Sequence, residues 1–207
     1  MTVAWTASWR DLVTDYIRRE AQPADKFGHQ PRLYALALRI AGGSNSNCDD
    51  DVLFAAAWMH DLGVFVGHRP SDPLVLAGWD HVPYTVERST ELLLKWGFPA
   101  GKLEAVAETI RTHQAKDKAV LAEAVVLRDA DILEQLGAIG ALRAIVKVGR
   151  DTRYATYSDI VPVLERALEE LPGQLVLEAS QRLAATRVAT LRQFLGAIRE
   201  EASDPLY

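Results

Sequence analysis

His60 and Asp61 follow a run of eight apolar residues that begins at Val52, and their types and placement could do chemistry. A run with no polar face predicts a helix that is buried on nearly all sides. An imidazole and a carboxylate at the end of such a helix are costly to bury unless they are paired, hydrogen-bonded or bound to a metal. Taken alone, the pair is better explained as a neutral core histidine beside an aspartate that caps the next turn.

Further metal-capable side chains recur along the chain in an orderly series. The series is His29, His60-Asp61, His81, His113 and Asp129-Ala130-Asp131. Each member lies in or beside a segment whose apolar residues favour a helix. Helical bundles build metal sites in this way, from inward-facing side chains of several helices. The series therefore favours a metal centre over an isolated core histidine.

The rest of the sequence predicts an all-α protein in which these helices are separated by turns. A polar segment over 41–51 and a Gly- and Pro-containing segment over 97–101 interrupt the apolar patterns. The segment from Gly149 to Ser158 leads to a C-terminal pair of helices, with Pro172-Gly173 between them. No segment alternates convincingly with period two. We expect a single domain over 1–207, with a helical core at about 22–148 and C-terminal helices at about 158–201.

Two sequence segments carry a resemblance to a known family. The segment 55–63, AAAWMHDLG, resembles the segment around the HD dipeptide in the HD superfamily of metal-dependent phosphohydrolases. The segment 127–140, LRDADILEQLGAIG, resembles a second segment in a bacterial subgroup that hydrolyses nucleotides. The similarity runs from about His29 to Gly140, and it departs at Glu134-Gln135, where the family often has a second acid. The resemblance implies an HD-domain helical bundle with a C-terminal helical extension.

The resemblance also implies which residues bind a metal. In the order H…HD…D, the ligands are His29, His60, Asp61 and Asp131. Asp129 lies two residues before Asp131, about 200° around a helix, so it cannot face the same point directly. We expect Asp129 to support or cap the site without binding the metal. Imidazole and carboxylate ligands suit Mn, Fe, Mg, Co, Ni or Zn, and a second metal is an alternative.

The catalytic roles that the resemblance implies fall on Asp61, His81 and His113. A bound divalent metal, manganese for example, would activate water and neutralise charge on a phosphoryl group. One carboxylate oxygen of Asp61 could orient or deprotonate the water, while His81 and His113 bind phosphate, protonate the leaving oxygen or hold a second metal. Each histidine also has a structural interpretation, His81 as a helix cap and His113 as a charge favoured at a helix end.

Basic residues near the first ligand could contact substrate phosphate. Lys26 precedes His29 and Arg32 lies one turn beyond it, on the same face of the expected helix. His68 lies in a loop rich in Gly and Pro after the HD pair, and we interpret it as a solvated loop residue. The substrate would be a small phosphate compound, with a nucleotide favoured.

Composition limits the class of partner and compartment. The net charge of −5 and the lack of a basic run argue against nucleic-acid binding. The single cysteine, Cys48, cannot form an internal disulfide, so we expect a cytoplasmic protein. Met1–Trp5 lacks the features of a signal peptide, and no apolar stretch reaches the ~20 residues needed to cross a bilayer. The last helix has an apolar stripe that we expect to cover the core, although a homodimer could also use it.

Three functions fit these observations. The leading one is a phosphohydrolase that acts on a nucleotide or a similar phosphate ester or anhydride through a metal-activated water. The full set of six ligand-type residues also resembles HD-fold mixed-valent di-iron oxygenases, which cleave C–C or C–P bonds with O₂. The third alternative is a non-catalytic domain that senses nucleotides. The similarity over 127–140 favours the first.

Overall fold

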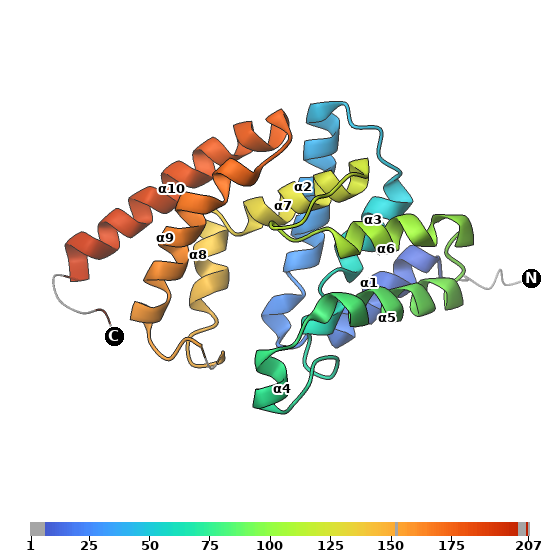
Figure 1. Cartoon of the computed structure of the whole chain (residues 1–207), viewed down its shortest axis with the longest axis horizontal. Helices are drawn as coiled ribbons and strands as arrows, with labels where there is room; N and C mark the ends of the chain where they lie inside the picture. The colour runs from blue at the N-terminus through green and yellow to red at the C-terminus, as the bar shows by residue number, and fades with distance from the viewer. Residues whose placement is uncertain (1–6, 152, 203–205, 207) are drawn as a thin grey trace, which may run out of the picture. The chain divides into compact units, whose positions relative to one another are not determined.

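The computed structural model of the chain describes residues 7–151, 153–202 and 206. These residues form ten α-helices joined by turns and short 3₁₀ helices, without a β-strand, which confirms the predicted all-α class (Figure 1). The chain divides into two compact units, with the boundary between Leu127 and Arg128. The prediction of a single domain over 1–207 stays a prediction, and Met1–Trp5 lies outside the described residues.

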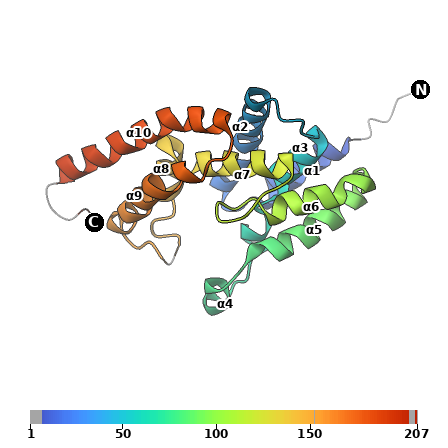
Figure 2. The same cartoon turned by 45° about the horizontal axis from the view of Figure 1, so that its top comes forward.

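The first unit contains six complete helices and the beginning of a seventh. They are α1 (Trp9–Glu20), α2 (His29–Ser44), α3 (Asp50–Met59), α4 (Pro73–Ala77), α5 (His81–Lys95), α6 (Leu103–Arg111) and the first half of α7 (Ala122–Glu134). α5 and α6 pack side by side, and α3 packs against α1, α2 and α6 (Figure 2). The four histidines of the predicted site belong to this unit.

Helix α3 is the core of the first unit. All eight residues from Val52 to Met59 are buried, as the sequence predicts for a run without a polar face. Its polar contacts lie at the N-terminus, where Asp49 caps the helix by accepting a hydrogen bond from the backbone N–H of Asp51 at 2.9 Å. Lys102 forms ion pairs with the carboxylates of both residues, at 2.7 and 2.8 Å. The helix is thus anchored at its solvent-facing end.

Helix α1 was not predicted, although its start carries a local signal. The Ser8 and Asp11 side chains form a capping box at its N-terminus. Trp9 then packs edge-on against Phe54 of α3 and Phe98, with ring centroids 5.5 and 4.8 Å apart. These contacts help to bury Phe54 on the face of α3 that α1 covers.

The second unit contains the rest of α7 and three further helices. These are α8 (Gly137–Ile145), α9 (Val161–Glu170) and α10 (Glu178–Ala202). α10 packs against α8 and α9, with Ala184, Leu191 and Leu195 of its apolar stripe buried. Within this unit, the stripe covers the core as expected.

Two glycines shape the break between α7 and α8. Gly137 has φ +73°, a left-handed conformation that side chains other than glycine rarely adopt. A Cβ atom at Gly140 would lie 2.2 Å from the carbonyl oxygen of Gln135. The second glycine is therefore required by close backbone packing and not by its own backbone conformation.

Cys48 lies half-buried in the segment that leads into α3. Burial, together with the nearby carboxylate of Glu123, raises the pKa of its thiol to about 11. Over the described residues, no helix is long and apolar enough to span a membrane.

We predict that Gly140→Ala destabilises the protein by about 1–3 kcal/mol, because the new methyl group must displace backbone. Gly196→Ala is the matched control, since a Cβ at Gly196, inside α10, meets no atom within 4 Å. The control should keep or raise the stability, because alanine favours a helix interior over glycine. Urea unfolding followed by circular dichroism measures both, and equal midpoints for the two variants would contradict the packing argument.

Candidate metal centre

His60 and Asp61 lie where the buried helix α3 stops and the chain turns. α3 ends at Met59, and His60, 1% exposed, follows in helical conformation. Asp61 then precedes the 3₁₀ helix η2 (Leu62–Val64). The turn keeps both side chains close together at the end of an apolar helix.

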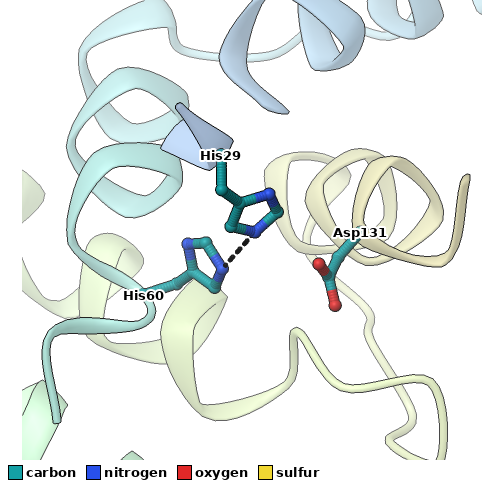
Figure 3. A group of neighbouring side chains, drawn as sticks. All are labelled: His29, His60 and Asp131. Atoms are coloured by element: carbon teal, nitrogen blue, oxygen red, sulfur yellow. Dashed lines mark hydrogen bonds between the residues drawn. The ribbon is translucent and has the colours of Figure 1, made fainter. Parts of the chain in front are cut away.

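Three other elements of the first unit bring their histidines to this point. His29 is the first residue of α2, His81 is the first of α5, and His113 follows the end of α6. The Nε2 atoms of His29 and His60 lie 3.3 Å apart (Figure 3). The ring centroid of His113 lies 5.0 Å from that of His60 and 5.8 Å from that of His81. Four histidines far apart in the sequence therefore form one cluster.

Backbone carbonyl groups fix the orientation of two of these rings. Nδ1 of His60 lies 3.0 Å from the carbonyl oxygen of Ala57, and Nδ1 of His113 lies 2.6 Å from that of Ile110. Because a carbonyl oxygen can only accept, Nδ1 is the donor in each pair. The proton on Nδ1 leaves the Nε2 lone pair available as a ligand, which is the usual arrangement of metal-binding histidines.

The two carboxylate oxygens of Asp61 face different imidazoles. Oδ2 lies 3.7 Å from Nε2 of His60 and 4.0 Å from Nε2 of His29. Oδ1 lies 3.7 Å from Nε2 of His81. Ligand atoms of His60, Asp61 and His113 all lie within 4.8 Å of one another, close enough to share a metal ion. Imidazole nitrogens with a carboxylate fit a divalent cation such as Mn²⁺, Fe²⁺ or Zn²⁺.

The electrostatics of the cluster favour an ionised Asp61. Burial would raise the pKa of its carboxyl group, but attraction to His60, His29 and His81 when they are protonated, and to Lys26, outweighs burial and holds the pKa far below its ordinary value. The carboxylate is therefore in the form that binds metals.

The helix-cap interpretation of His81 is not needed, because another residue caps α5. The side chain of Asp80 accepts a hydrogen bond from the backbone N–H of Val82 at 3.0 Å. This leaves the imidazole of His81 to face Asp61.

Two aspartates of α7 belong to the second unit and differ in their surroundings. Asp129 is fully buried and accepts hydrogen bonds from the backbone N–H groups of Val176 and Leu177, at 3.2 and 2.9 Å. These N–H groups immediately precede α10. Asp131, labelled in Figure 3, has its Oδ1 4.0 Å from Nη1 of Arg143 and its Oδ2 3.2 Å from the Gln135 amide. Its role as a ligand stays a prediction, as does the supporting role of Asp129.

The predicted phosphate-binding residues lie on either side of His29 in the chain. Lys26 is half-buried at the end of the 3₁₀ helix η1 (Ala24–Lys26). The side chain of Gln30, with its amide oriented to donate, lies 2.7 Å from the carbonyl oxygen of Lys26, which ties η1 to the start of α2. Arg32 is exposed on the first turn of α2.

His68 is not the solvated loop residue that the sequence suggested. Its side chain is 8% exposed, with Nδ1 2.9 Å from the hydroxyl of Tyr84 and Nε2 3.2 Å from a carboxylate oxygen of Glu20. These contacts fasten the loop after η2 to α1 and α5. No local sequence pattern marks these contacts, because the partners lie 48 and 16 residues away.

A cavity of about 610 Å³ lies beside His68, between α1 and α5. None of the predicted site residues lines it. Its walls carry the carboxylates of Glu20, Glu87 and Glu91 against the single guanidinium of Arg88. This balance would repel a phosphate, so the cavity does not suit the predicted substrate.

Comparison with known proteins gives a family and a shared fold. A model of the HD domain family matches residues 27–136. The structure resembles Bacillus subtilis YpgQ in complex with ADP, with 19% identity, 93% of this chain and 97% of that chain covered, and a TM-score of 0.69. It also resembles an HD-superfamily hydrolase from Bacillus thuringiensis, with 16% identity, coverage of 95% and 97%, and a TM-score of 0.67. No curated protein matches the sequence.

We predict that His60→Ala and Asp61→Ala each weaken Mn²⁺ binding severely. Loss of a ligand should cost more than the roughly 10- to 100-fold that loss of an outer hydrogen-bond partner costs. His68→Gln is the control, because it replaces a histidine outside the cluster by another side chain that can hydrogen-bond. Equilibrium dialysis with metal analysis measures the affinity. Equal Mn²⁺ binding by all four proteins would exclude this cluster as the metal centre.

Proposed function

The chain belongs to the HD domain family, and on that premise we propose that it is a metal-dependent phosphohydrolase acting on a nucleotide or a related phosphate ester or anhydride. The observation that carries the proposal is the convergence of four imidazoles and the ionised Asp61 at the buried end of α3. Burying these groups together is costly without a cation. Such a cost is expected at a functional site and not in a purely structural core.

The proposed metal ligands are His29, His60, Asp61 and Asp131. The distances among the first three support their part in the set. Asp131 is supported by the match to the HD domain, which extends through residue 136.

These residues would hold a divalent cation, which would offset the charge building on the phosphoryl group and lower the pKa of water. One carboxylate oxygen of Asp61 orients the water and accepts its proton. His81 and His113 bind phosphate oxygens or donate a proton to the leaving oxygen. Lys26 and Arg32 add positive charge near His29. Phosphoryl transfer depends more on such neutralisation of charge than on covalent catalysis.

A nucleotide is the favoured substrate. The Bacillus subtilis YpgQ structure was obtained in complex with ADP, and this chain shares its fold over almost its full length. The residues 127–140 add the resemblance to a subgroup that hydrolyses nucleotides. These two similarities support the substrate class, while the chemistry rests on the metal cluster.

One observation favours a second candidate function. Oδ1 of Asp61 faces His81, and Oδ2 faces His29 and His60, so each carboxylate oxygen would be available to a separate metal ion. A bridged pair of ions with six ligands would also suit a mixed-valent di-iron oxygenase. The two functions differ in their metal content and in their use of O₂.

We predict that the Mn²⁺-loaded protein releases orthophosphate or pyrophosphate from at least one nucleoside or deoxynucleoside triphosphate. His81→Ala and His113→Ala should each lower kcat by roughly 10²- to 10⁴-fold, as expected for loss of a proton-transfer group. Each variant should keep one bound metal, because the four ligands remain. A phosphate-release assay with and without added pyrophosphatase identifies the product, and His68→Gln is again the control.

Different results would overturn this assignment. No release from any nucleotide by a fully metal-loaded protein would contradict the phosphohydrolase. Two bound irons, together with O₂ consumption in the presence of an organic phosphonate or polyol, would establish the oxygenase instead.

We predict that substitutions of the two aspartates of α7 have different effects, one on metal binding and the other on stability. Asp131→Asn should weaken Mn²⁺ binding with little loss of stability. Asp129→Asn should lower the stability by about 1–3 kcal/mol, because a buried acceptor of backbone N–H groups is replaced by an amide. Thermal unfolding of the metal-free proteins and Mn²⁺ dialysis measure the two effects. Reversed results, with Asp129→Asn losing the metal, would exchange the two roles.

A further inference from the structure

Gly63, two residues after Asp61, is held through both of its backbone polar groups. Its N–H donates a buried hydrogen bond to Oγ1 of Thr85 at 3.0 Å. Its carbonyl oxygen accepts a hydrogen bond from Nε1 of Trp79 at 2.9 Å. Trp79 precedes His81 in the sequence and Thr85 follows it. Gly63 of η2 is therefore hydrogen-bonded to residues on both sides of His81, at the start of α5.

The fastening depends on direct backbone contact. A Cβ atom at Gly63 would lie 2.9 Å from the carbonyl oxygen of His81 and 3.0 Å from its Cβ. No other residue type allows η2 to approach α5 this closely. Asp61 and His81 are 20 residues apart in the sequence. The contact of Gly63 with the start of α5 brings them together, so that Oδ1 of Asp61 lies 3.7 Å from Nε2 of His81.

We infer that Thr85 and Trp79 are positioning residues that set the separation between Asp61 and His81. Thr85 is fully buried and so cannot exchange its bond to Gly63 for one to water. A metal centre tolerates errors of only about 0.5 Å in its ligands. Because Asp61 is the residue whose two oxygens face both groups of imidazoles, loosening η2 changes the whole cluster. The effect on turnover rests on the proposed function, whereas the effect on the geometry does not.

Thr85→Val tests the inference, because it removes the acceptor and keeps the shape of the side chain. We expect Mn²⁺ affinity and kcat to fall about 10- to 100-fold with KM for the nucleotide little changed, as for loss of an outer hydrogen-bond partner. Thr85→Ser keeps the hydroxyl and should retain the Mn²⁺ affinity and kcat of the wild-type protein. Thr109→Val is the matched control, since Thr109 is equally buried in α6 and its Oγ1 has no hydrogen-bond partner in the described structure.

Two further measurements keep the test decisive. In the metal-free protein, the imidazole ¹H–¹⁵N NMR signals of His81 should shift in Thr85→Val but not in Thr109→Val. Trp79→Phe removes the other hydrogen bond and keeps an aromatic ring beside Tyr84, and it should act in the same direction, which covers the case in which Thr85→Val does not fold. Unchanged His81 signals and Mn²⁺ affinity in Trp79→Phe and in folded Thr85→Val would overturn the inference, as would equal losses in Thr109→Val. Absence of nucleotide hydrolysis by the wild-type protein would refute the proposed function alone.

Discussion

Imidazole nitrogens and carboxylate oxygens that could bind a metal are buried together around His60, and this burial is the constraint on which the first unit depends. The donors lie at the end of α3, whose residues from Val52 to Met59 carry no charged side chain. Carbonyl groups of Ala57 and Ile110 satisfy one nitrogen of His60 and of His113, and the remaining donor atoms face one another. The surrounding helices must then be held in place by contacts outside the cluster. The ion pairs of Lys102, the aromatic packing of Trp9 and the hydrogen bonds of Gly63 supply them.

Much of the fold and the order of the site residues could be predicted from local sequence. The apolar run before His60 predicts a buried helix from its composition alone, without knowledge of the helices that pack against it. The histidines precede or follow recognisable helices, so their convergence could be expected from the bundle. The resemblance supplied what spacing alone does not, namely that Asp131 and not Asp129 is the expected ligand.

The features that could not be predicted depend on residues that are distant in the sequence. His68 is buried because Glu20 and Tyr84 happen to meet it, and neither partner is marked by spacing. Helix α1 begins with a readable capping box, but its packing depends on Phe54 and Phe98. Gly63 ends the sequence segment that resembles the HD superfamily, but only the structure shows that its lack of a side chain serves the contact with His81. A helical pattern predicts which face is apolar, but not which backbone atoms will touch.

The state of Cys48 bears on which ions the protein can acquire in a cell. Burial and the carboxylate of Glu123 raise the pKa of its thiol to about 11, so the proton release that metal binding requires costs more here than at an ordinary thiol. The chain has no other cysteine among its 207 residues. A single sulfur ligand with a raised pKa disfavours soft ions such as Cu(I), which are selected by sites with several sulfur ligands. Loading should follow the supply of ions that prefer nitrogen and oxygen, so the metal content would report the growth conditions as much as the protein.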